Sequence, residues 1–130
     1  VHIYGEVSVS LTTCSLDELL KESDFISLHV PKPKDGALIG AVEFSKMKDN
    51  VILVNASRGG VVNESDLLKA LESGKVAAAG LDVFENEPQP MAELLNHPRI
   101  SVTPHIGAST NEAQTRIGIE LAEKVIAAIG

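Results

Sequence analysis

The sequence has few of the residues that cross-link secreted proteins or anchor membrane proteins. It contains one cysteine, Cys14, no tryptophan and only 3% aromatic residues. A single cysteine forms no internal disulfide, and no Cys/His cluster gives it the spacing of a metal site. No apolar run reaches the roughly 18 residues of a membrane span, and the N-terminus lacks the basic start of a secretory signal. We therefore expect a soluble, cytoplasmic protein without a metal.

Positive charge is also scarce. Eleven Lys and Arg residues stand against 18 Asp and Glu residues, which gives a formal net charge of −7. A chain with this balance offers no basic patch for a phosphate backbone or an anionic lipid surface. We therefore expect neither nucleic acid nor a membrane as a partner. The 130 residues, 44% of them hydrophobic, suffice for one domain with its own core.

Apolar runs of strand length alternate with helical segments along the chain. This alternation is typical of βα units that build a parallel sheet, so we predict a Rossmann-like α/β fold. The runs are nearly continuous in apolar character, which predicts strands covered by helices on both faces. The predicted strands are 25–30, 51–55, 76–83 and 100–103.

Capping signals mark the predicted helices. Capping boxes stand at Ser15–Glu18 and at Ser109–Glu112, while Asn63 is suited to cap a third helix that ends before Gly74. The last helix is expected to run close to the C-terminus with an apolar stripe, because residues of this kind recur at helical spacing: Ala113, Ile117, Leu121, Val125 and Ala128.

The first 14 residues allow two interpretations. Residues 1–4 and 7–11 form either two short strands or one strand followed by an irregular arm. No G-x-G-x-x-G fingerprint occurs in the chain, so the turn that cradles phosphates in dinucleotide-binding folds is absent from it.

Three segments at predicted strand ends carry candidate chemistry, and the first contains Arg58. The run from Asn55 to Gly60 leaves a buried strand and places a guanidinium group beside two glycines. Ligands bind at the carboxyl ends of strands in open α/β sheets, and a guanidinium fork matches a carboxylate. The alternative is a surface arginine in a glycine turn.

The second segment contains two acidic candidates, Asp82 and Glu87. Asp82 is suited to accept a hydrogen bond from an amide or hydroxyl group, and Glu87, held before Pro88, is suited to orient an imidazole. The alternative is a solvated acidic loop.

The third segment, 103–109, places His105 between a strand end and a helix start. Histidine is the side chain best suited to exchange protons near neutral pH. The alternative is a hydrogen-bonded structural histidine, which is how we interpret the three other histidines: His2, His29 and His97.

Taken together, these segments resemble the D-2-hydroxyacid dehydrogenase family. The markers are Leu16–Leu20, Ser27–Pro31, Leu53–Gly60, the run to Glu87-Pro88, and Thr103-Pro104-His105. The string that begins at His105 and continues through Gln114 is most similar to the phosphoglycerate dehydrogenase branch of the family.

The resemblance implies hydride transfer between NAD and a 2-hydroxy acid, with a catalytic triad in this chain. By matching motif, Arg58 would hold the substrate carboxylate and the oxygen on which negative charge develops. His105 would exchange the hydroxyl proton, and Glu87 would hydrogen-bond the imidazole and fix its tautomer. The same mapping implies cofactor contacts at Val30, Pro31, Ala56, Ser57, Arg58, Asp82, His105, Gly107 and Ala108.

The chain also departs from the family. Gly5 occupies the position of the family's ribose-binding acidic residue, with Glu6 beside it, and the glycine fingerprint and the substrate-binding domain have no counterpart. We therefore interpret residues 1–130 as one partial NAD-binding domain, in which 15–130 follow the family and the structure of 1–14 stays open.

The resemblance favours a small-molecule 2-hydroxy acid as substrate, with 3-phosphoglycerate and serine biosynthesis first, in a homo-oligomeric enzyme. Three alternatives stay open. They are a hydroxypyruvate, glyoxylate or lactate-type reductase of the same family, a co-repressor-like binding protein, and a truncated fragment without activity.

Overall fold

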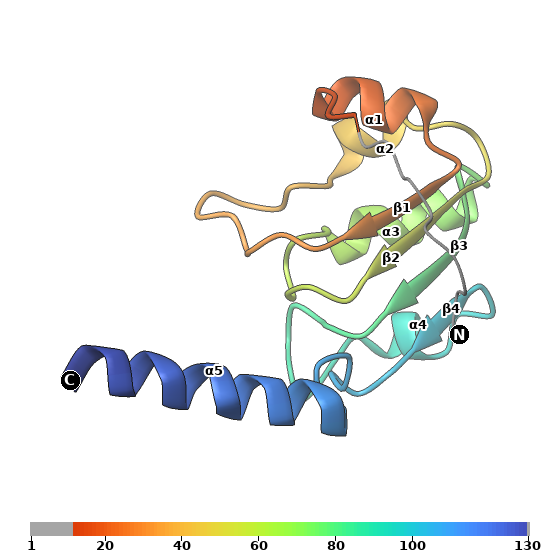
Figure 1. Cartoon of the computed structure of the whole chain (residues 1–130). Helices are drawn as coiled ribbons and strands as arrows, with labels where there is room; N and C mark the ends of the chain where they lie inside the picture. The colour runs from red at the N-terminus through yellow and green to blue at the C-terminus, as the bar shows by residue number, and fades with distance from the viewer. Residues whose placement is uncertain (1–11, 130) are drawn as a thin grey trace, which may run out of the picture.

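The computed structural model describes residues 12–129, which form helices and strands in regular alternation (Figure 1). The predicted strands 1–4 and 7–11, together with Gly5 and Glu6, lie outside the described residues. The elements are α1 (Leu16–Glu22), β1 (Phe25–Leu28), α2 (Ala41–Lys46), β2 (Val51–Asn55), α3 (Glu64–Glu72), β3 (Val76–Leu81), α4 (Ala92–Leu95), β4 (Ile100–Val102) and α5 (Asn111–Ile129).

The four strands form one parallel sheet in the order β1-β2-β3-β4. Ile26 lies beside Leu53, Leu53 beside Ala79, and Ala79 beside Ile100. Because all four strands run in the same direction, their carboxyl ends meet at one edge of the sheet. The predicted Rossmann-like α/β fold is confirmed, and the three candidate segments leave the sheet at this shared edge.

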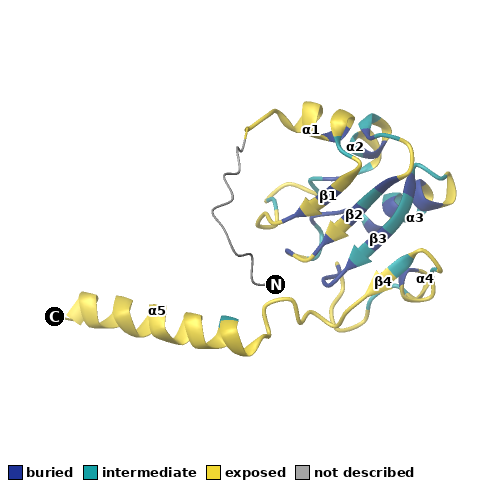
Figure 2. Cartoon of the chain, turned by 45° about the vertical axis from the view of Figure 1, so that its right-hand side comes forward, coloured by how far each residue is buried: buried dark blue, intermediate teal, exposed yellow. Residues whose placement is uncertain are grey.

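Helices α1, α2 and α3 cover one face of the sheet (Figure 2). Apolar side chains from these helices and from alternate strand positions form the core, for example Leu20, Phe44, Leu67, Leu53 and Val76. Burial of this apolar area is the main favourable contribution to folding. The site is therefore built on a packed layer of strands and helices.

The prediction that both faces are covered is wrong for the part of the chain that the structure describes. In β1 the pattern is alternating, with Ile26 and Leu28 buried and Phe25 74% exposed. Val54 of β2 is also exposed on the same face as Phe25. No described helix packs on this side of β1 and β2, and α5 runs away from the sheet (Figure 1).

The capping predictions are confirmed at two helices and wrong at a third. The Ser15 hydroxyl accepts a hydrogen bond from the Glu18 amide in a capping box, and Asn63 accepts one from the Asp66 amide at 2.9 Å. Gly74 follows α3 with φ of 81°. The box predicted at Ser109–Glu112 is wrong, because Thr110 accepts from the Ala113 amide at 3.1 Å and the helix begins at Asn111.

Three predicted strands are shorter than expected, with β4 ending one residue early at Val102, and two short helices were not predicted. Strand β1 ends at Leu28, two residues early, and β3 ends at Leu81 because the chain turns at Asp82. Helices α2 and α4 have six and four residues. Such short helices carry too little periodicity to be recognised in a sequence.

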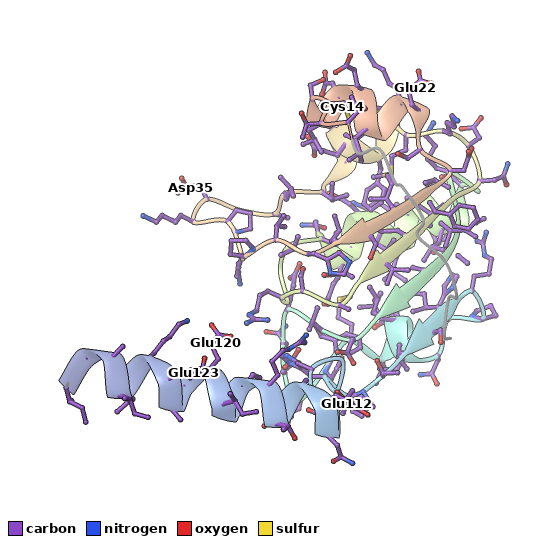
Figure 3. All side chains as sticks on the ribbon, viewed as in Figure 1. Cys14, Glu22, Asp35, Glu112, Glu120 and Glu123 are labelled. Atoms are coloured by element: carbon purple, nitrogen blue, oxygen red, sulfur yellow. The ribbon has the colours of Figure 1, made fainter. Side chains whose placement is uncertain are left out.

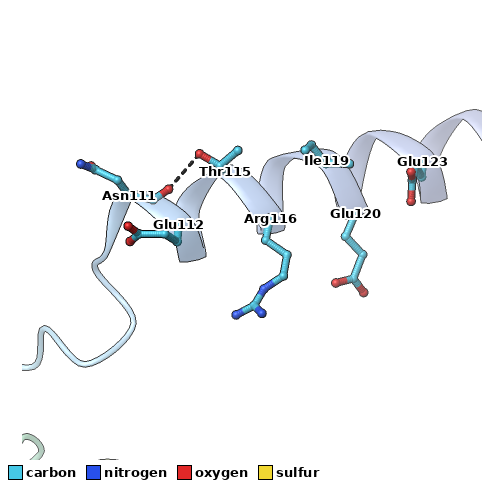
Figure 4. A pocket seen from close by; sticks show the side chains of 7 residues that line it. All are labelled: Asn111, Glu112, Thr115, Arg116, Ile119, Glu120 and Glu123. Carbon is cyan, nitrogen blue, oxygen red and sulfur yellow. Dashed lines mark hydrogen bonds between the residues drawn. The ribbon is translucent and has the colours of Figure 1, made fainter. Parts of the chain in front are cut away.

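Helix α5 extends away from the sheet and has no buried residue (Figures 1 and 2). Its charged side chains include Glu112, Glu120 and Glu123 (Figure 3). A hollow of about 530 Å³ runs along it, lined only by residues of the helix itself (Figure 4). None of the candidate site residues lies in that hollow. Between residues 12 and 129, no helix combines the length and the apolar character needed to cross a membrane.

Candidate active site

Three cavities lie along the carboxyl ends of the strands. The first, of about 330 Å³, is lined by His29, Val30, Pro31, Ala56, Ser57 and Arg58. The second, of about 300 Å³, includes Ala56, Asp82, Thr103 and Gly107. The third, of about 350 Å³, includes Glu87, Thr103 and His105. Ala56 lines both the first and the second cavity, and Thr103 lines both the second and the third, so the three cavities are neighbours along this edge.

Arg58 is presented by a turn that a buried asparagine holds together. The Asn55 side chain is 2% exposed, and its oxygen accepts hydrogen bonds from the Ser57 amide and from the Ser57 hydroxyl at 2.7 Å. Its amide nitrogen donates to the Arg58 carbonyl at 3.2 Å. The Arg58 guanidinium donates to the Ser57 carbonyl and is otherwise exposed. Most of its donors are therefore directed to solvent and available to an anionic ligand.

Gly59 brings the Arg58 turn against the turn that follows β3. A Cβ atom at Gly59 would stand 1.7 Å from the Phe84 carbonyl oxygen. Only glycine permits two backbones to approach so closely. The backbone that carries Arg58 is thus in direct contact with the backbone that leads to Glu87.

Asp82 holds the backbone around His105. The Asp82 side chain accepts hydrogen bonds from the Thr103 hydroxyl, from the Ile106 amide at 2.9 Å and from the Gly107 amide at 2.8 Å. Burial by itself raises the pKa of this carboxyl group, but the three hydrogen bonds and the neighbouring His105 outweigh burial and lower the pKa below its usual 3.8. Asp82 is therefore charged at neutral pH and fixes the turn from Thr103 to Gly107.

His105 and Glu87 form the central pair of the site. His105 Nδ1 lies 2.8 Å from Glu87 Oε2, and the other oxygen of Glu87 accepts from the Phe84 amide at 2.9 Å. These two hydrogen bonds, with the imidazole contributing most, lower the pKa of Glu87 below its usual 4.5. A charged carboxylate at Nδ1 favours a proton on that nitrogen and leaves Nε2 as the acceptor. His105 is 48% exposed, so Nε2 is accessible to a substrate.

The structure brings some predicted residues into contact and leaves others apart. His105 and Glu87 are hydrogen-bonded, whereas Arg58 touches the pair only indirectly, through Gly59 and the Phe84 turn. Val30, Pro31, Ala56 and Ser57 line the same cavity as Arg58. Ala108 lines none of the three cavities, and its carbonyl accepts from the Gln114 side chain.

His29 differs from the setting expected of it. It follows β1 instead of lying inside the strand, it hydrogen-bonds Ser27, and it lines the cavity that contains Arg58. His97 accepts from the Arg99 amide at 3.2 Å, which agrees with a structural histidine. His2 lies outside the described residues.

Sequence reasoning gave no role to several residues that build the site, namely Asn55, Thr103, Phe84 and Glu64. Asn55, Thr103 and Phe84 lie in the three segments that contain the candidate residues, so their closeness in sequence to a candidate could have indicated a role in the site. Glu64 had no such signal, because an acidic residue in the first turn of a helix is common. Within the described part of the chain, no three His, Cys, Asp or Glu residues gather into a metal site.

Comparison with known proteins places this arrangement in a family. The family described as "D-isomer specific 2-hydroxyacid dehydrogenase, NAD binding domain" matches residues 4–107. The chain belongs to this family. The family is defined by NAD binding, which confirms NAD as the predicted cofactor, and its members are oxidoreductases.

Two curated relatives of this chain are named as different enzymes. The hydroxypyruvate reductase of Thermotoga maritima is 50% identical over 129 residues, which cover 96% of this chain and 42% of the relative. The D-3-phosphoglycerate dehydrogenase of Archaeoglobus fulgidus is 48% identical over 120 residues, which cover 91% of this chain and 23% of the relative. The chain thus spans less than half the length of these relatives.

A solved structure of the family superimposes closely. The glyoxylate reductase from Paecilomyes thermophila matches with a TM-score of 0.82 and 46% identity, over 89% of this chain and 36% of the other. At this identity the likeness extends beyond the fold to the sequence.

The cavities of this dehydrogenase-family chain fit part of an NAD molecule. The walls of the second cavity are largely apolar, with the small residues Ala56, Gly80 and Gly107 among them. A Cβ atom at Gly107 would stand 2.9 Å from the Asp82 carboxylate, so this glycine keeps the wall flat. Flat, apolar walls with a carboxylate at one side suit an aromatic ring that carries an amide.

Proposed function

We propose that this chain supplies the catalytic residues of an NAD-dependent D-2-hydroxyacid dehydrogenase in a protein of the relatives' full length. The observation that carries the proposal is the 2.8 Å contact between His105 Nδ1 and Glu87 Oε2, at the same carboxyl edge of the parallel sheet as Arg58. A histidine backed by a carboxylate is the arrangement that general acid–base catalysis requires.

Each residue of the proposed triad has one task in the oxidation. The substrate hydroxyl proton passes to His105 Nε2, and Glu87 stabilises the imidazolium that forms. Arg58 holds the substrate carboxylate and the C2 oxygen, whose negative charge grows as the proton leaves. NAD, when bound, supplies the acceptor for the hydride from C2. In the reverse reaction His105 returns the proton to the oxygen.

The proposed cofactor contacts follow the two cavities that share Ala56. Val30 and Pro31 would line the adenosine side, while Ser57, Asp82 and Gly107 would lie on the nicotinamide side. Oδ2 of Asp82 accepts one hydrogen bond, from the Gly107 amide, so it retains a lone pair for the carboxamide. His105, which lines the third cavity, and Ala108, which lines none of the three, complete the nicotinamide side of the proposal.

For the substrate, we propose 3-phosphoglycerate first, because the segment after His105 resembles that branch and a relative of this name is 48% identical. In that case the protein acts in serine biosynthesis in the cytoplasm, as a homo-oligomer. Hydroxypyruvate is the second candidate, supported by the 50% identical reductase. Comparing kcat/KM for both substrates and for glyoxylate on the full-length protein separates the two.

The test of the reaction class is His105→Asn in the full-length protein. Removing the acid–base group should lower kcat by about 10² to 10⁴-fold, while NADH binding measured by fluorescence stays within a few-fold of the wild type. Arg99→Lys, at an exposed position outside the three cavities, is the control and should keep full turnover. A variant His105→Asn with near-normal kcat would overturn the assignment.

A further inference from the structure

Glu64 is a buried carboxyl group that the proposed mechanism does not use. It is the first residue of α3 and is 4% exposed. One of its oxygens, Oε2, has no hydrogen-bond partner. Burying a carboxyl group without full satisfaction costs free energy, so a residue of this kind needs an explanation beyond stability.

The other oxygen of Glu64 holds the turn that presents Glu87. Glu64 Oε1 accepts a hydrogen bond from the Glu85 amide at 2.6 Å, and the Glu85 side chain accepts one from the Glu64 amide at 3.3 Å. The amide of Phe84, the residue before Glu85, donates to Glu87. Two successive backbone amides are therefore fixed, one by Glu64 and the next by Glu87.

The same turn is held from its other side by the Arg58 segment. The Phe84 carbonyl lies against Gly59, so the turn is enclosed between Gly59 and Glu64. Gly59 and Glu64 belong to one stretch of chain that runs from β2 into α3. This stretch fixes the distance between Arg58 and the turn that carries Glu87.

We propose that Glu64 is a positioning residue for the dehydrogenase reaction: its buried carboxyl group holds the Phe84–Glu87 turn so that Glu87 meets His105. The inference rests on the proposed function and adds a residue to it. Burial, followed by the nearby charges of Glu85 and Glu87, raises the pKa of Glu64 above its usual 4.5 although the Glu85 amide opposes this. Glutamine has nearly the same shape as glutamate and keeps an oxygen that can accept from the Glu85 amide, so it is the closest substitute for Glu64.

The experiment compares Glu64→Ala and Glu64→Gln in the full-length protein. Alanine removes the acceptor for the Glu85 amide, so kcat should fall on the order of 10 to 100-fold while KM changes less than about threefold, as expected for a misplaced catalytic group. Glutamine keeps the acceptor and should retain kcat within about threefold. Glu72→Ala, at the exposed end of the same helix, is the matched control and should match the wild type.

Amide hydrogen exchange gives a second measurement that does not depend on turnover. In Glu64→Ala the amides of Phe84 and Glu85 should exchange at least about tenfold faster, while the amide of Leu53 in β2 keeps its rate. Unchanged kcat and unchanged exchange in Glu64→Ala overturn the proposal, and so does a Glu64→Gln variant as impaired as alanine. If the wild type oxidises no 2-hydroxy acid, the proposed function fails while the exchange result still tests the positioning role.

Discussion

Residues 20–94 and residues 101–129 differ in how far their side chains are buried. The first region contains every buried side chain of the described structure, whereas in the second only Ala113 is even partly covered. Yet the predicted acid–base residue, His105, belongs to the second region. The position of His105 is therefore set by hydrogen bonds to the first region instead of by packing around it.

Two carboxylates connect the regions. Asp82 accepts hydrogen bonds from the Thr103 hydroxyl before His105 and from the Ile106 and Gly107 amides after it, while Glu87 binds the His105 ring. Both carboxylates follow β3, a strand inside the sheet whose neighbours are β2 and β4. A packed core can therefore fix a reactive side chain that lies outside it, through hydrogen bonds to a few charged groups.

The largest effect is expected when one leucine is substituted in each region, because this tests the difference in burial directly. Leu67→Ala empties a fully buried position in α3 and should lower the free energy of unfolding by about 2–5 kcal/mol. Leu121→Ala removes a side chain that is 61% exposed in α5 and should change it by less than about 0.5 kcal/mol. Urea unfolding followed by circular dichroism measures both. Equal losses of unfolding free energy in the two variants would mean that α5 packs against another surface in solution.

A smaller effect is expected from breaking one of the connecting carboxylates. Asp82→Asn keeps one oxygen acceptor but removes the charge, and should cost about 1–3 kcal/mol of unfolding free energy at pH 7. Because the folded pKa of Asp82 is lowered, its stabilising contribution is complete above pH 3.8 and is lost as the pH falls below that value. The difference in unfolding free energy between Asp82→Asn and the wild type should therefore become smaller at acidic pH. A difference that is constant from pH 7 to pH 3 would contradict this role.

The smallest effect is predicted for an ion pair within α5. Lys124 lies 2.6 Å from Glu120, one helical turn away, with both side chains mostly exposed. Exposed pairs of this kind contribute little, so Lys124→Ala should alter the free energy of unfolding by no more than about 0.5 kcal/mol. Thermal melts at low and at 0.5 M salt, compared with the wild type, provide the check. A loss above 1 kcal/mol would show that the exposed region is coupled to the core.

The sequence predicted the elements that have strong periodicity or a clear cap. The strands began where their apolar runs began, and Ser15 and Asn63 capped helices as their spacing indicated. Strand ends were less predictable, since β3 stops where Asp82 turns to bind residues 24 and 25 positions later. A contact of that range leaves no mark in the local pattern.

The sequence predicted the residues of the candidate site but few of the contacts between them. Glu87 and His105 stood out as an acid and a base at neighbouring strand ends, and the structure joins them at 2.8 Å. The contact of Gly59 with Phe84, and the role of Glu64, depend on three-dimensional packing between segments 21 or more residues apart. The uncovered face of the sheet was missed because apolar strand residues look the same whether or not a helix lies on them.

The backbone at His105 has a practical consequence for trapping a bound complex. Its φ of 56° lies in the left-handed region, which asparagine and glycine enter at lower cost than alanine does. Alanine would thus remove the imidazole and strain the turn together, so that loss of chemistry and loss of shape could not be told apart. Asparagine removes only the proton carrier. A crystallographer who wants substrate and NAD held unreacted side by side should choose His105→Asn.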